Sequence, residues 1–234
     1  MNHQHMIATC IALSVAACAP AAFFSSTLDV NSMPSAQGCS YFALNSGLTE
    51  SQVFAPGAGV MTINTIGNGY QSQGGNLAIR AADHNEMEYG MNWAIEARVR
   101  VLSGELWSFH YGFCLAAEFD GMSASLGIMP STYQHYSLQG GARDNTQWTT
   151  WRLETDRDAG IYRVYADGSL LAAGALYFGP SSPGFPDHYV AFGDGTGGAN
   201  AHAEVSSLTF RQFVPTPGAA CVLSLFALAA RRRR

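Results

Sequence analysis

Glu118 and Asp120 are the two carboxylates in this sequence whose spacing best suits acid–base chemistry. Residues two apart on a β-strand share a face, so both carboxyl groups can flank one glycosidic bond, as glycoside hydrolysis requires. Gly121 follows directly and interrupts such a strand. The preferred interpretation is therefore a solvated strand end that enters a turn.

Aromatic residues gather in the middle third of the chain, and some have polar neighbours. Flat rings pack on the apolar faces of sugars, and an amide such as Asn145, close to Trp148, can hydrogen-bond sugar hydroxyls. Most of these rings are expected to fill a core, where aromatic residues dominate burial. The residues from which a sugar-contacting subset would come are Trp107, Tyr111, Tyr133, Tyr136, Asn145 and Trp148.

Other familiar catalytic and cofactor motifs find no support. Residues 193–198 satisfy Gly-x-Gly-x-x-Gly, but a dinucleotide site needs a helix after it, and residues 199–205 alternate like a strand. The histidines are scattered, without His-Glu-x-x-His or Cys-x-x-Cys spacing, and no Gly-x-Ser-x-Gly elbow occurs. Dinucleotide, zinc and serine-hydrolase chemistry are therefore not expected.

Alternation of apolar and polar residues organises the rest of the chain. In residues 93–101 the odd positions are apolar, whereas Glu96, Arg98 and Arg100 are charged, which is typical of a strand with one wet face. Residues 151–155 repeat this pattern. After a turn at 156–160, residues 161–165 return as a partner strand, and Asp167-Gly168 predicts a type I′ hairpin into the next strand.

Further strands are predicted at residues 60–64, 77–80, 113–119, 189–192 and 203–213, with glycine-rich turns between them. No stretch of twelve or more residues in the body has convincing helical periodicity. The predicted fold class is therefore all-β, with two stacked antiparallel sheets.

Three segments, in this order, resemble the laminin-G-like group of the concanavalin A-like lectin/glucanase family. They are Trp-Ala-Ile-Glu-Ala-Arg-Val at residues 93–99, Tyr-Arg-Val-Tyr-Ala-Asp-Gly at 162–168, and Phe-Gly-Asp-Gly-Thr at 192–196. The resemblance spans residues 50–213 and rests on the order and spacing of the segments. It implies a jelly-roll β-sandwich, in a family that includes lectins, adhesive modules and glucanases.

The resemblance also bears on the candidate site residues. Related glucanases carry a third acid further along the catalytic strand, where this chain has Ser123, so the catalytic set is incomplete. Relatives often bind calcium through loop carboxylates at a sheet rim, which makes Asp120 and Asp194 the candidate calcium ligands. No other cofactor is expected.

The first 22 residues resemble a secretory signal peptide. Residues 6–17 form an apolar helical core too short for a permanent span, and Ala19-Pro20-Ala21 offers small residues for cleavage. Cleavage near Ala21 or Ala22 is the preferred outcome. Residues 15–18 also resemble a lipobox, in which Cys18 would be acylated instead.

The C-terminal segment, residues 214–234, resembles a PEP-CTERM sorting signal. Val214-Pro215-Thr216-Pro217 precedes an apolar run at residues 218–230, and the chain then ends with Arg231, Arg232, Arg233 and Arg234. The apolar run would enter the membrane, the arginines would hold its end on the cytoplasmic side, and an exosortase-type enzyme would cut near the prolines. Thr216 stands where the family usually has Glu. A simple C-terminal anchor is the alternative.

The predicted domain between these ends, residues 23–213, is acidic. All 17 acidic residues lie in it, whereas four of the 12 arginines form the C-terminal cluster, so binding to nucleic acid is not expected. The domain holds two cysteines, Cys39 and Cys114, which export to an oxidising compartment would allow to pair. Buried unpaired thiols are the preferred interpretation.

Together these features predict an exported, non-catalytic module that binds a polysaccharide or glycan, or serves adhesion, in the cell envelope or extracellular matrix. Only the signal and the tail would engage the membrane. One alternative is a glycoside hydrolase that uses Glu118 and Asp120. Another is a structural surface protein without a small ligand.

Overall fold

The computed structural model describes residues 22–44, 47–68, 75–81, 91–107, 111–119, 121–135, 139–178, 188–195 and 198–213. Predictions that concern Asp120, Tyr136, the signal and the sorting segment therefore lie outside the described residues. The elements are β1 (Ala22–Leu28), η1 (Pro34–Gln37), β2 (Ser40–Leu44), α1 (Glu50–Val53), β3 (Phe54–Gly57), β4 (Val60–Asn64), β5 (Gly75–Ala81), β6 (Asn92–Leu106), β7 (Phe113–Phe119), β8 (Met122–Ile128), β9 (Thr132–His135), β10 (Gln139–Ala142), β11 (Thr149–Asp156), β12 (Ile161–Ala166), β13 (Ser169–Ala175), β14 (Tyr177–Phe178), β15 (Tyr189–Asp194) and β16 (Ala199–Phe213).

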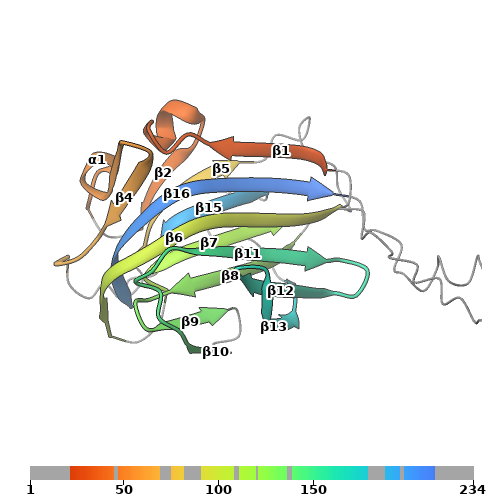
Figure 1. Cartoon of the computed structure of the whole chain (residues 1–234). Helices are drawn as coiled ribbons and strands as arrows, with labels where there is room; N and C mark the ends of the chain where they lie inside the picture. The colour runs from red at the N-terminus through yellow and green to blue at the C-terminus, as the bar shows by residue number, and fades with distance from the viewer. Residues whose placement is uncertain are drawn as a thin grey trace, which may run out of the picture.

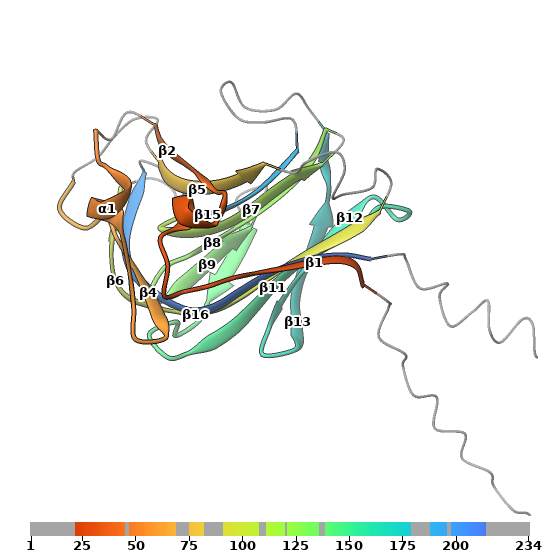
Figure 2. The same cartoon turned by 90° about the horizontal axis from the view of Figure 1, so that it is seen from above.

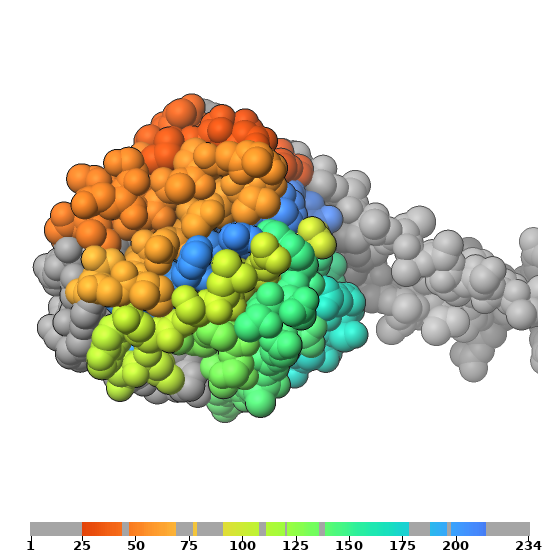
Figure 3. All heavy atoms as spheres, turned by 60° about the vertical axis from the view of Figure 1, so that its left-hand side comes forward, coloured from red at the N-terminus to blue at the C-terminus, as the bar shows by residue number. Residues whose placement is uncertain are grey.

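The strands form two antiparallel sheets that pack face to face, which confirms the predicted all-β sandwich (Figures 1 and 2). Sheet A has the order β13-β12-β11-β6-β16-β4-β3, with β1 pairing with β16 beyond the end of β4. Sheet B has the order β10-β9-β8-β7-β15-β5-β2, with β14 pairing with β8. The bands of colour in Figure 3 follow the order of sheet A from β4 through β16 and β6 to β11.

Alternation decides which face of each strand is buried, as the sequence predicts. Trp93 and Ile95 on β6 are each only 1% exposed, whereas Arg98 on the same strand is exposed. Phe119 of β7 faces them from sheet B, with its ring centre 6.0 Å from that of Trp93. Phe113 and Leu115 of the same strand are fully buried in the same core. Apolar side chains from both sheets thus form one continuous core between them.

The outer face of sheet A is covered by charged pairs. Arg100 contacts Glu204 at 2.6 Å, and Arg163 contacts Asp156 at 2.9 Å. Trp148 lies on this face beneath Arg98 and Arg100, whose guanidinium carbons are 5.0 and 4.8 Å from the ring centre. The charged positions of β6 in the sequence predict this solvent-exposed face.

The hairpin between β12 and β13 has the predicted turn. Asp167 and Gly168 adopt φ values of 49° and 79°, the positive values that both central positions of a type I′ turn require. The carboxylate of Asp167 also accepts a hydrogen bond from Thr150 N at 2.9 Å and one from Arg143 at 2.8 Å. These bonds tie the turn to the start of β11.

The first and last described strands lie side by side. Ala22 of β1 is the register partner of Phe213 of β16, and Figures 1 and 2 show both strands together along one margin of sheet A. The domain therefore starts and ends at one corner. In the described residues no helix is long and apolar enough to cross a membrane.

Candidate functional site

The outer face of sheet B carries a set of polar and aromatic side chains. Inward residues of β7 such as Leu115 belong to the main core, so the alternate residues, including Glu118, point to the opposite side. On this side Tyr111, Cys114 and Tyr189 belong to a second, smaller apolar cluster, separate from the main core. The polar and apolar groups together define the candidate site.

Strand register aligns four of these residues in one row, which we call the tyrosine row. Tyr189 of β15 stands opposite Glu118 of β7, Glu118 stands opposite Ser123 of β8, and Ser123 stands opposite Tyr177 of β14. Neighbouring strands are about 4.8 Å apart, so the row spans roughly 14 Å. A carboxylate and a hydroxyl thus lie between two phenol groups.

The next row on the same face has only small side chains. Ala191, Ala116 and Ser125 stand opposite one another across β15, β7 and β8. Beyond them, Gly193, Cys114 and Gly127 form a third row. The centre of the face is therefore flat, while larger side chains stand at its margin.

Tyr111 closes one side of this flat centre. It precedes β7, its side chain is 8% exposed, and the hydroxyl of Ser125 donates to its phenol oxygen at 3.4 Å. The backbone N–H of Gly195 donates to the Tyr111 carbonyl at 3.2 Å. A Cβ on Gly195 would come within 2.7 Å of the Cys114 sulfur, so this position needs glycine. Gly195 thus serves close packing, and a strand begins at Ala199, as the sequence predicts, where a dinucleotide site would need a helix.

Burial governs the titration of two groups on this face. Burial, the negative charge of Glu118 and the neighbouring Cys114 all raise the pKa of Tyr189 above its usual value. Burial and the negative charge of Asp194 raise the pKa of the Cys114 thiol to about 12. Both groups are therefore protonated at neutral pH, and the Tyr189 phenol keeps its O–H for donation.

The arrangement favours recognition of hydroxyl-rich ligands. The Glu118 carboxylate is a hydrogen-bond acceptor, the Ser123 hydroxyl and the phenols can donate or accept, and the rings offer apolar surface. Tyr177 is 43% exposed, so its ring is accessible at the end of the row. On the next strand of the sheet, Gln134 of β9 stands opposite Gly127 and adds an amide to the face.

The aromatic residues singled out by sequence do not meet in one place. Tyr111 lies on the outer face of sheet B, whereas Trp148 lies on the outer face of sheet A, on the opposite side of the sandwich. Tyr133 packs at the core on Trp151, with ring centres 5.4 Å apart. Trp107 is 44% exposed just after β6.

Asn145 holds the backbone of a neighbouring loop. Its side chain is 1% exposed and its amide donates to the carbonyls of Met129 and Thr132 at 2.8 and 2.9 Å. Its backbone also bonds to Pro130 and Val101. These contacts give Asn145 a structural role, independent of any ligand.

Of the two candidate calcium ligands, Asp194 ends β15 and is 2% exposed. Across the part of the chain that the structure describes, no three His, Cys, Asp or Glu side chains gather closely enough to hold a metal ion. Cys39 and Cys114 are buried and form no disulfide. They lie on opposite faces of sheet B, Cys39 in the main core and Cys114 in the outer cluster.

Sequence reasoning singled out Glu118, named Ser123 only as the position where related glucanases have an acid, and missed Tyr177, Tyr189, Ser125 and Gln134. These residues are far apart in the chain, and only the pairing of β15, β7, β8, β9 and β14 brings them to one face. The weak alternation in residues 122–128 is the signal that could have placed Ser123 and Ser125 on the face opposite the core, whereas residues 189–192 are all apolar and carry no such signal.

Comparison with known proteins supports the fold. No family model matches the sequence, and no curated protein matches it. A carbohydrate esterase from the Shiga toxin-encoding bacteriophage phi24B is similar in structure, with a TM-score of 0.53 and 15% identity over 83% of this chain and all of that chain. A sialidase matches 83% of this chain with a TM-score of 0.50 and 9% identity, but only 19% of the sialidase is covered.

A plant lectin, lectin I-B4 from Griffonia simplicifolia, matches 81% of this chain and 99% of that chain, with a TM-score of 0.48 and 11% identity. The class that the two sheets define is the concanavalin A-like jelly-roll β-sandwich, as the sequence predicts.

Proposed function

We propose that this protein is an exported, non-catalytic carbohydrate-binding module that holds a glycan against the outer face of sheet B. The observation that carries the proposal is the tyrosine row, in which Glu118 and Ser123 lie between Tyr189 and Tyr177. Hydroxyl-rich ligands need several hydrogen-bonding groups on one rigid surface, together with rings for the apolar faces of the sugar.

The flat centre of the face supports the same proposal. Because Ala116 and Ser125 are small and half-buried, a sugar ring can lie on this part of the sheet beside the tyrosine row, next to the fully buried Ala191. Tyr111 then stands beside the ring. Sites built on strands are more rigid than sites built on loops, so little ordering is needed when the ligand binds.

The named structural neighbours are consistent with a sugar-related role. The phage protein is described as a carbohydrate esterase, and the larger neighbour is a sialidase. At 15% and 9% identity these names support a sugar ligand for this fold class and leave its chemistry to the residues of this chain.

The location that we propose is the cell envelope or the extracellular matrix. It rests on the apolar segments at both ends of the sequence and on the Pro-x-Pro and arginine cluster of the tail. An exosortase-type enzyme would process the tail. The domain itself would meet the membrane only through the signal and the tail.

A glycoside hydrolase that uses Glu118 and Asp120 is the competing proposal. Retaining and inverting mechanisms both need two carboxyl groups on either side of the bond. In the described part of the tyrosine row the neighbours of Glu118 are a phenol and a hydroxyl, which favours binding over hydrolysis. A structural surface protein would bind no glycan at all.

A glycan array probed with residues 22–213, followed by calorimetry on the best ligand, tests the proposal. Tyr177→Ala removes an accessible ring of the row, and we expect it to weaken binding by about tenfold. Tyr165→Ala is the matched control, because that ring lies on the outer face of sheet A under Arg152. No glycan bound above background, or equal losses for both variants, would overturn the proposal.

A further inference from the structure

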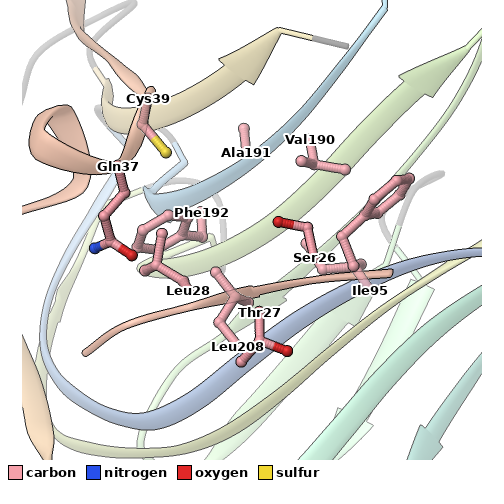
Figure 4. Close-up of a pocket in the computed structure, with 11 residues that line it drawn as sticks. Ser26, Thr27, Leu28, Gln37, Cys39, Ile95, Val190, Ala191, Phe192 and Leu208 are labelled. Atoms are coloured by element: carbon pink, nitrogen blue, oxygen red, sulfur yellow. The ribbon is translucent and has the colours of Figure 1, made fainter. Parts of the chain in front are cut away.

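A cavity of about 110 Å³ lies between the two sheets beside β1. Figure 4 shows its walls, with Ser26 and Leu28 of β1 and Leu208 of β16 on one side and Val190 and Phe192 of β15 on the other. Cys39, directly before β2, points toward the cavity from above in this view. It is therefore an internal space of the sandwich, behind the candidate glycan face.

The walls of the cavity are mostly apolar. Seven of the lining residues have hydrocarbon side chains: Leu28, Ile95, Val190, Ala191, Phe192, Leu208 and Phe210. Among the described residues that line it, none is charged. Gln37 also lines it, but its amide is bonded to the loop before η1, with Oε1 accepting from Asp29 N at 2.6 Å and Nε2 donating to the carbonyls of Asp29 and Ser32.

The position of β1 explains why this space opens toward solvent. In the described part of the chain β1 pairs with β16 alone, so its other edge is a margin of sheet A. Thr27 at this margin is exposed, and Ser26 is half-buried. A molecule can thus enter past β1 with one end inside the apolar space and the other end in water.

We propose that this cavity binds the alkyl end of an amphiphile, such as a lipid acyl chain. Apolar cavities of about 150 Å³ stay dry and take up a benzene-sized ligand, so this one accepts roughly four to six carbon atoms. The polar head of the ligand then stays in water near Thr27. Since most of the lining side chains are hydrocarbon and none of the described ones is charged, the cavity favours an alkyl end over a polar chain end.

The direct test uses 1-pentanol as the probe and 1,5-pentanediol as its matched control. Both have five carbons, but the diol has a polar group at each end. We expect 1-pentanol to shift the methyl NMR signals of Leu28, Ile95, Val190 and Leu208 in a saturable way. The diol should leave them unchanged. At ten times its dissociation constant 1-pentanol should raise Tm by about 3 °C.

Two neighbouring serines provide matched variants. Ser26→Leu places a larger side chain in the cavity, whereas Ser25→Leu adds the same group at an exposed position of the same strand. We expect the first to abolish 1-pentanol binding and the second to leave it unchanged. Cys39→Met fills the space from the other wall and serves as a second blocking variant if Ser26→Leu does not fold.

Saturable 1-pentanol binding that both blocking variants retain would overturn the proposal, as would the absence of any saturable shift in the natural sequence. Equal binding of the diol would exclude the alkyl-end specificity. The result is independent of glycan binding, because the cavity and the tyrosine row lie on opposite faces of sheet B.

Discussion

Glu118 of β7 and Tyr189 of β15 stand directly opposite each other on the outer face of sheet B. Glu118 is 4% exposed and Tyr189 is 8% exposed, so the carboxylate and the phenol share a poorly hydrated environment. Burial and the negative charge of Glu118 raise the pKa of Tyr189, so its phenol stays protonated. Such a pair combines a hydrogen-bond acceptor and a donor.

Hydrolysis is not expected from this arrangement. Residues 22–213, incubated with β-glucans, xylan and galactans, should release no reducing sugar above a blank, because Glu118 has Tyr189 and Ser123 as its cross-strand neighbours. The Glu118→Gln variant should behave the same in this assay. Its glycan affinity should fall, since an amide is a weaker acceptor than a carboxylate.

Sugar release by the natural sequence, lost in Glu118→Gln while thermal unfolding is unchanged, would instead establish the glycoside hydrolase. Glu204→Gln is a suitable comparison, because that carboxylate lies on the outer face of sheet A with Arg100.

Two positions of β6, Ile95 and Arg98, test whether this strand buries only one of its faces. Ile95 is 1% exposed and also lines the alkyl cavity, so Ile95→Asp places an unpaired carboxylate between the sheets. That costs several kcal/mol, comparable to the whole stability of a domain. We expect the cooperative thermal transition to be lost.

Arg98→Ser on the same strand is the control. Arg98 is exposed, it lies 5.0 Å from the Trp148 ring centre and it donates to Ser206 at 3.3 Å. Loss of such exposed contacts should cost less than about 1 kcal/mol. Similar unfolding midpoints for the two variants would contradict the one-sided strand.

Much of the fold follows from local patterns in the sequence. The bounds predicted for β4 and β7 match the structure, and the alternation around Trp93 places β6 correctly. β8 was missed, because small residues such as Ser123 and Gly127 make its alternation weak. β1 and β2 lie before the region of family resemblance, and their place depends on pairing with β16 and β5, which no local pattern reveals.

The candidate site was harder to predict than the fold. Trp148 and Tyr111 lie near one another in the sequence region rich in aromatics, yet they end on opposite sides of the sandwich. Clustering along the chain does not specify the face, and because these two residues precede β11 and β7, the alternation of those strands does not place them either. Tyr189 joins Glu118 only through the pairing of β15 with β7, a contact between distant segments.

The ion pair of Asp156 and Arg163 should make stability depend on pH in acid. The hydrogen bond from Arg163 lowers the pKa of Asp156 below its usual value. A depressed carboxyl pKa stabilises the fold above the unfolded value near 4, and this contribution is lost as pH falls through the folded pKa. Because the pair is partly exposed and screened by solvent, the effect is expected to be no more than about 0.5 kcal/mol.

Thermal unfolding of Asp156→Asn measures this contribution. We expect Tm to be lower than in the natural sequence at pH 7, and the difference to disappear near pH 2. Asp158→Asn, an exposed position in the same turn, should show no such difference. A gap that persists unchanged in acid would contradict the assignment.

Alkylation of Cys114 should be much slower in the folded protein than in the unfolded protein. Because the pKa of Cys114 is raised to about 12, the reactive thiolate is scarce at pH 8, and the side chain is only 3% exposed. Iodoacetamide should therefore leave Cys114 unmodified in the folded protein and modify it rapidly in denaturant, as peptide mass analysis would show. Rapid labelling of the folded protein would contradict the position of Cys114 against Gly195.

The last prediction concerns cleavage of the chain at both ends. The register of β1 limits how far cleavage at the N-terminal end can extend without removing a strand. Ala22 pairs with Phe213, and β1 supplies Ser26 and Leu28 to the cavity wall, so removal of residues up to Ala21 leaves the described sheet complete. We expect surface material to lack residues 1–21 and the segment after Pro217, because both apolar runs are short and flanked like removable signals.

Intact-mass analysis of the surface protein decides among the possible ends. A mass that begins near Ala22 and ends near Pro217 supports cleavage at both sites, whereas an added acyl mass on Cys18 supports the lipoprotein. Retention of Arg231 to Arg234 would leave a simple C-terminal anchor. Since Ala22 and Phe213 leave the sandwich at one corner, either anchor would tether the domain from that corner. A cut inside β1 would instead remove the partner of the C-terminal half of β16, and Tm would fall with it.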